Sequence, residues 1–132
     1  MSNRVLDVPA LLDIATGRTQ FMRARWHVAR DTASTLIVPW CAAAEAARRL
    51  SLGDRAELRV FLAAPMVVVP EAPVTSAMVC AEMTSRNGKR PDWDAVQVVY
   101  EAVRRGWPIV TDDRHLERLL DLDPYLAFER LP

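Results

Sequence analysis

Short runs of aliphatic and β-branched residues recur along the chain, separated by longer stretches with helical spacing of apolar positions. Four such runs, at 4–7, 36–39, 66–70 and 108–111, predict strands, and a fifth, edge strand is expected at 126–129. Apolar residues repeat every three or four positions between them, which predicts helices at 9–15, 19–34, 41–50, 55–63, 75–84, 94–105 and 116–120. Gly17 and Gly106 follow two of these helices and are expected to end them.

Alternation of short strands with helices is typical of a parallel sheet covered on both faces. We therefore predict a single α/β domain over residues 1–132, with a parallel sheet of four or five strands. Right-handed crossovers bring the carboxyl ends of such strands to one edge, where ligands bind in open α/β sheets. The strand residues expected in the core are Val5, Leu6, Ile37, Val38, Val67, Val68, Val69, Ile109 and Val110.

Composition narrows the classes of function without selecting one. The chain has 132 residues, 51% of them hydrophobic and 26% charged, which suits one ordinary globular domain. Its 17 basic and 17 acidic residues cancel, so the overall charge gives no sign of nucleic-acid binding. Without an apolar run of about 18 to 20 residues or a secretion signal, we expect a cytoplasmic protein and no membrane association. Cys41 and Cys80 have no metal-ligand spacing and are expected to be small buried residues.

Carboxylates lie near the ends of several of the expected strands, and with this fold we expect them to converge on one edge of the sheet. Two of them 5 Å apart would repel by about 3 kcal/mol at an effective dielectric of about 20, so a cluster would raise its pKa values or bind a cation. Oxygen ligands suit Mg²⁺ or Mn²⁺, which can activate water and neutralise charge on a phosphodiester. The candidates are Asp7, Glu45, Asp92, Asp94, Asp112 and Asp113.

Local roles remain open for two of these acids, Asp94 and Glu45. Asp94 and Gln97 have the spacing of a capping box, with Asp94 as the N-cap of its helix. Glu45 and Arg49 lie four residues apart, which favours a surface ion pair.

A local role is also open at the last strand but not at the first. Thr111 or Asp112 could cap the helix that follows them. Pro9 suits the first helical position, so Val8 rather than Asp7 is the expected cap of the first helix.

Four segments resemble those of a known family, the PIN domains, and especially the VapC-type ribonuclease toxins of bacterial toxin–antitoxin pairs. Residues 5–12 resemble the opening strand and helix, and 42–45 the segment with the helix-borne acid. Residues 94–102 resemble the segment that begins with the third acid. Residues 107–116 are similar to the closing signature, in which Thr, any residue and Asp supply the fourth acid, which selects Asp113 over Asp112.

The resemblance implies a three-layer, Rossmann-like fold and an endoribonuclease that depends on Mg²⁺ or Mn²⁺. It implies that Asp7, Glu45, Asp94 and Asp113 form the catalytic and metal-binding set, so Asp92 is expected to point away or to lie in an outer shell, as is Asp112. It also implies an RNA substrate, frequent homodimers and, for a toxin of a type II pair, an antitoxin partner.

Three positions depart from the family pattern. Val8, Pro9 and Ala42 stand where the family usually carries hydroxyl residues that position acids or waters. Losing such support can weaken a metal site by about 10- to 100-fold. The alternative is therefore a catalytically weakened PIN-like domain that acts as an RNA- or protein-binding module. A phospho-receiver domain would need a lysine at a strand end, whereas the single lysine, Lys89, lies in an expected loop.

Two basic segments are candidates for phosphate contact. Arg86, Lys89 and Arg90 surround Gly88 in a polar loop just before Asp92. The second candidate is a helical patch formed by Arg23, Arg25 and Arg30.

Four tryptophans are more aromatic mass than a small core requires. Tryptophan is favoured at the centres of protein interfaces, so at least one is expected in a homodimer or partner interface. They are Trp26, Trp40, Trp93 and Trp107.

Overall fold

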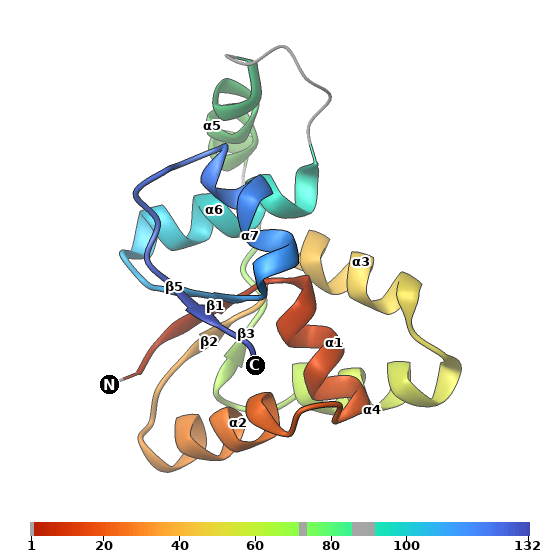
Figure 1. Ribbon diagram of the computed structural model, residues 1–132. Helices are drawn as coiled ribbons and strands as arrows, with labels where there is room; N and C mark the ends of the chain where they lie inside the picture. Colours follow the sequence, from red (N-terminus) through yellow and green to blue (C-terminus); the bar gives the residue numbers. More distant parts are fainter. Residues whose placement is uncertain (1, 72–73, 86–91) are drawn as a thin grey trace.

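The fold is a five-stranded, fully parallel sheet with helices on both sides (Figure 1). The computed structural model describes the chain except residues 1, 72–73 and 86–91. The strand order is β3-β2-β1-β4-β5, so β1 lies at the centre and β3 and β5 form the edges. The strands are β1 (Arg4–Leu6), β2 (Leu36–Ile37), β3 (Val67–Val68), β4 (Ile109–Thr111) and β5 (Phe128–Arg130). The predicted α/β class and the fifth, edge strand are confirmed.

Helices cover the sheet from two sides. Figure 1 shows α2 below the strands, α1 to their right, and α5 and α6 above them. Both α1 and α6 contact β1 and β4, so these two of the three inner strands are enclosed between helices. The helices are α1 (Val8–Thr16), α2 (Phe21–Asp31), α3 (Trp40–Arg49), α4 (Leu52–Leu62), α5 (Val74–Ser85), α6 (Trp93–Arg105) and α7 (Asp113–Leu120).

The strand residues predicted for the core are buried, except two beside or within the edge strand β3. Val5, Leu6, Ile37 and Ile109 are fully buried, as their positions on inner strands require. Val68 and Val69 were predicted in the core, and this was wrong, because each is 41% exposed. Among the described residues β3 pairs only with β2, and the local pattern of valines did not reveal the exposed side of this edge strand.

Helix ends settle the local alternatives that the sequence left open. Asp7, not Val8, is the N-cap residue of α1, although its side chain forms no capping bond there. The capping-box reading of Asp94 was wrong, because α6 begins at Trp93 with Asp92 at its N-cap. Asp112 does cap α7, since its side chain accepts a hydrogen bond from the His115 amide.

The Gly17 turn directs the chain from α1 into α2. Gly17 ends α1 with a φ of 67°, a left-handed conformation that favours glycine. A Cβ at this position would lie 2.7 Å from the Arg23 guanidinium carbon, so the turn is crowded as well as left-handed. Within the described ranges, no helix is long and apolar enough to cross a bilayer.

Candidate functional site

The site is built around Asp7, at the carboxyl end of the central strand. Its side chain is fully buried, and its Oδ2 accepts a hydrogen bond from the Thr111 hydroxyl at 2.8 Å. Its Oδ1 accepts a bond from Arg118 Nη2 at 2.7 Å. The Asp7 amide also donates to the Val110 carbonyl at 3.1 Å, which fixes the carboxylate against β4. Both oxygens of this buried acid are therefore engaged.

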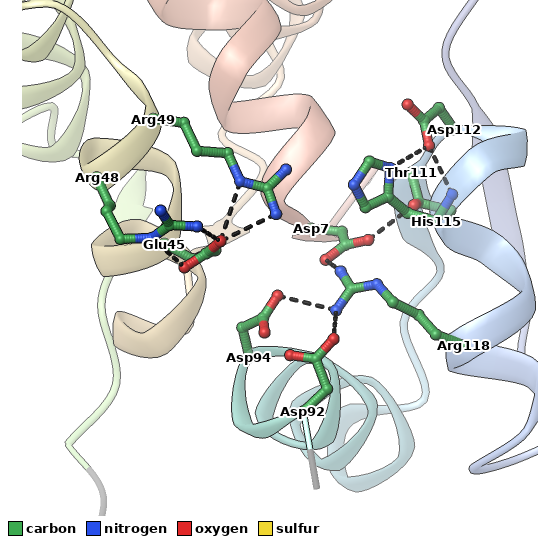
Figure 2. Close-up of polar contacts among 10 residues, drawn as sticks. All are labelled: Asp7, Glu45, Arg48, Arg49, Asp92, Asp94, Thr111, Asp112, His115 and Arg118. Atoms are coloured by element: carbon green, nitrogen blue, oxygen red, sulfur yellow. Dashed lines mark hydrogen bonds and ion pairs between the residues drawn. The ribbon is translucent and has the colours of Figure 1, made fainter. Parts of the chain in front are cut away.

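Arg118, on α7, joins three carboxylates from two segments (Figure 2). Its Nη2 donates to Asp7, while its Nη1 donates to Asp94 at 2.9 Å and to Asp92 at 3.0 Å. Its Nε is buried, with no hydrogen-bond partner in the part of the chain that the structure describes. The chain itself thus supplies a cation to these acids, where Mg²⁺ or Mn²⁺ was predicted from the sequence.

Burial is the main cause that raises the pKa of two of these carboxylates, Asp7 and Asp94. Burial raises the pKa of Asp7, even though Arg118 and the Thr111 hydroxyl act in the opposite direction. Burial and the adjacent Asp92 raise the pKa of Asp94. Burial opposes the charge on Arg118, but the carboxylates around it raise its pKa above the ordinary value. Arg118 is therefore a permanent positive charge at this edge.

Glu45 lies on α3, and its carboxylate bonds side chains of the same helix. It accepts bonds from Arg48 at 2.6 Å and from Arg49 at 3.0 Å, which lie one turn further along (Figure 2). The hydrogen bond from Arg48 is the main reason that the pKa of Glu45 falls to about 2. Its charge is thus neutralised within α3, as the ion-pair alternative predicted for Arg49.

Asp113 and Asp112 both point to partners other than Arg118. The Asp113 side chain is 79% exposed and pairs with Arg130 on β5 at 2.8 Å. Asp112 Oδ1 accepts from the His115 amide at 2.8 Å and bonds the His115 ring at 2.6 Å.

The structure therefore does not gather the four predicted carboxylates into one group. Of Asp7, Glu45, Asp94 and Asp113, only Asp7 and Asp94 contact the common cation, and Asp92 joins them there. Among the described residues, no three His, Cys, Asp or Glu side chains lie close enough to hold a metal ion.

Oxygen donors of this kind suit Mg²⁺ or Mn²⁺ in type, but not in their present arrangement. The guanidinium takes one oxygen of Asp7 and one of Asp94, and Thr111 takes the other oxygen of Asp7. Arg118 thus occupies the position between Asp7 and Asp94 that an ion shared by the two carboxylates would need.

Arg118 was not identified from the sequence, although its position on the helix after β4 pointed to the acids. It follows His115 by three positions on the helix after β4, so both face the same side. A basic residue on that helix face, directly after the strand edge that carries the acids, could have been paired with them.

Of the two predicted basic segments, only the patch on α2 lies in the described part of the chain. Arg86, Lys89 and Arg90 lie outside the described residues. In the α2 patch, Arg25 pairs with Glu129 and Arg30 with Asp31, so these charges are already compensated.

Two of the tryptophans are exposed beside an apolar cavity between α3, α5 and α6. Trp40 is 52% and Trp93 50% exposed, and both line this cavity of about 450 Å³ with Cys41, Cys80 and Tyr100. Trp26 instead packs edge-on against Phe61, with ring centroids 5.1 Å apart. Trp107 packs against the core beneath the Arg105 guanidinium.

Comparison with known proteins finds a similar fold but no similar sequence. No family model matches the chain, and no curated protein matches it. A solved structure of VapBC2 from Rickettsia felis, bound to a DNA fragment from the promoter, contains a chain that superposes with a TM-score of 0.69. The alignment covers 96% of this chain and 97% of that chain at 12% identity, a level that supports the fold alone. The chain has a PIN-like fold.

Proposed function

We propose that this chain is a divalent-metal-dependent endoribonuclease, and the toxin of a type II toxin–antitoxin pair. The observation that supports this most is the buried carboxylate of Asp7 at the central strand end, with Asp94 and Asp92 facing the same cation. The PIN-like fold and the VapC-type sequence motifs agree with this chemistry. When bound, Mg²⁺ or Mn²⁺ would supply an activated water and neutralise charge on the phosphodiester.

The residues have separate roles in this proposal. Asp7 and Asp94 would hold the ion, and Thr111 would keep the Asp7 carboxylate oriented through its 2.8 Å hydrogen bond. Glu45 and Asp113 belong to the proposed set by their motif positions, and each would have to leave its arginine partner to contribute. Arg118 would be the resident cation that the ion replaces.

An RNA cleavage assay tests this proposal. The wild type should cut labelled single-stranded RNA in Mn²⁺ or Mg²⁺ and stop in EDTA, while Asp7→Asn and Asp94→Asn should abolish cleavage. Asp31→Asn is the matched control, because Asp31 is an exposed aspartate on α2. Wild-type cleavage no greater than that of the two site variants, with either metal and several RNAs, would refute the nuclease.

A second candidate is a PIN-like binding module with weakened catalysis. Arg118 occupying the acids, together with Val8, Pro9 and Ala42 at the family's hydroxyl positions, favours this reading. It predicts that RNA or a protein partner binds with the same affinity in EDTA and in Mn²⁺, without cleavage in either.

Partners are also part of the proposal. A VapC-type toxin would bind an antitoxin, and a VapBC2 complex contains a chain of similar fold. We further propose a homodimer, in which Trp40 and Trp93 would be covered by a second copy. Their exposure beside an apolar cavity supports this surface.

A further inference from the structure

A second cavity lies beside the acid site, and several cationic groups line it. It has a volume of about 300 Å³, and α1, the chain after Gly17, α3 and α7 all contribute to its wall. Arg18, Arg49, Arg114 and His115 come to this wall from three segments far apart in the sequence. No sequence motif assigned to the acid site includes Arg18 or Arg49.

The positive charge in this cavity is only partly compensated. Arg18 and Arg114 are exposed, and neither has an acidic partner within the described part of the chain. Asp13 lines the cavity too, but it is buried, and its oxygens accept bonds from Thr19 and from the Met22 amide. Two guanidinium groups are therefore free to receive an anion.

The other acid in the wall, Asp112, is also engaged. Its Oδ1 holds both the amide and the ring of His115, so it is oriented toward α7. Arg49 is bonded to Glu45, which leaves part of its donor fork available.

The cavity adjoins the acid site through residues that face both. His115 lies beside Thr111 and Asp7 in Figure 2, and Arg49 extends from α3 toward the same region. The cavity and the acid site therefore adjoin at His115.

We propose that this cavity binds a backbone phosphate of single-stranded RNA, held by Arg18 and Arg114 with Arg49 and His115 beside them. The planar guanidinium fork matches phosphate oxygens, and such contacts orient the strand without reading its bases. This inference rests on the proposed function, because it names how the same site holds its substrate.

Salt-dependent binding tests the proposal without cleavage. Anisotropy of a labelled single-stranded RNA would be measured in EDTA over a range of salt for the wild type and for Arg18→Gln/Arg114→Gln. Each phosphate neutralised on a single strand contributes about 0.7 to the slope of log affinity against log salt, so loss of the one phosphate in the cavity should lower the slope of the double variant by about 0.7. Arg59→Gln, an exposed arginine on α4 away from the cavity, should leave the slope unchanged.

A second measurement identifies the source of the phosphate. Side-chain NMR signals of His115 should move on adding the RNA, while those of His27, exposed on α2, should not. Movement with inorganic phosphate alone, with an unchanged RNA slope in the double variant, would overturn the RNA assignment. Absence of RNA binding by the wild type would overturn it as well.

The cleavage assay separates this inference from the nuclease. If no RNA is cleaved in Mn²⁺ but the salt slope of RNA binding depends on Arg18 and Arg114, the nuclease proposal is refuted and the phosphate site is supported. Cleavage with the same slope in the wild type and the double variant would remove the phosphate site and keep the nuclease.

Discussion

Replacing Arg118 with methionine would leave three carboxylates without the cation that joins them. Asp7 is fully buried, and removing one partner of a buried ion pair costs about 3 to 5 kcal/mol. A chain of 132 residues has a total stability of about 7 to 20 kcal/mol at typical values per residue, so the variant should still fold. Methionine keeps much of the aliphatic volume of arginine, which limits the loss to the charge and its hydrogen bonds.

Urea denaturation in EDTA and in Mn²⁺ measures this effect. In EDTA, the free energy of unfolding of Arg118→Met should fall by about 3 kcal/mol or more. In Mn²⁺, the variant should regain stability, because an ion at 100 times its dissociation constant adds about 2.7 kcal/mol. The wild type should gain less, since Arg118 competes for Asp7 and Asp94.

Asp7→Asn in the same background is the control for this reasoning. Removing the buried charge should recover much of the stability that Arg118→Met loses in EDTA and should remove the response to Mn²⁺. An Arg118→Met variant as stable as the wild type in EDTA would show that Arg118 does not compensate the acids. A larger gain of stability in Mn²⁺ for the wild type than for Arg118→Met would contradict the competition between Arg118 and the ion for Asp7 and Asp94.

Three further predictions concern association, ionisation and packing. Trp40→Ser/Trp93→Ser should convert a dimer to a monomer in light scattering; a monomeric wild type at high concentration would contradict the interface. The Glu45 carboxyl should titrate with a pKa of about 2 by NMR, and Arg48→Gln should raise that pKa toward 4.5. Because the pKa is lower in the folded protein, the contribution of this ion pair to stability is complete above about pH 4.5. That contribution is lost as the pH falls toward 2. Phe61→Ala should cost about 3 to 5 kcal/mol in urea unfolding, since the ring is fully buried against Trp26; a loss below 1 kcal/mol would mean that the core closes around the gap.

The fold could be predicted from sequence because its signals are local. Valine- and isoleucine-rich runs mark each inner strand, and Gly17 and Gly106 end helices through left-handed backbone conformations. The exposure of Val68 could not be predicted in this way, because it depends on the place of β3 in the sheet. Strand order is decided by pairings between distant segments, which no short window contains.

The candidate site was predicted in part, for a related reason. Asp7 and Asp94 were placed at one edge, since parallel strands and the helices between them bring their ends together. The partners of these acids were not foreseen, because Arg118 lies on a different element from either. Glu45 was the opposite case, where an arginine within one turn decides its contacts.

The separation of Asp7 and Arg118 in the chain also bears on how the protein is made. The two residues lie 111 positions apart, so at 5 to 20 residues per second the ribosome needs about 6 to 22 s to add the second after the first. For most of that interval β1 also lacks its neighbour β4, which carries the hydroxyl of Thr111. The Asp7 carboxylate must stay hydrated until the last helix exists, so the central strand of the sheet is completed late in synthesis. A nascent chain therefore carries its acids in water for seconds before they can form a site.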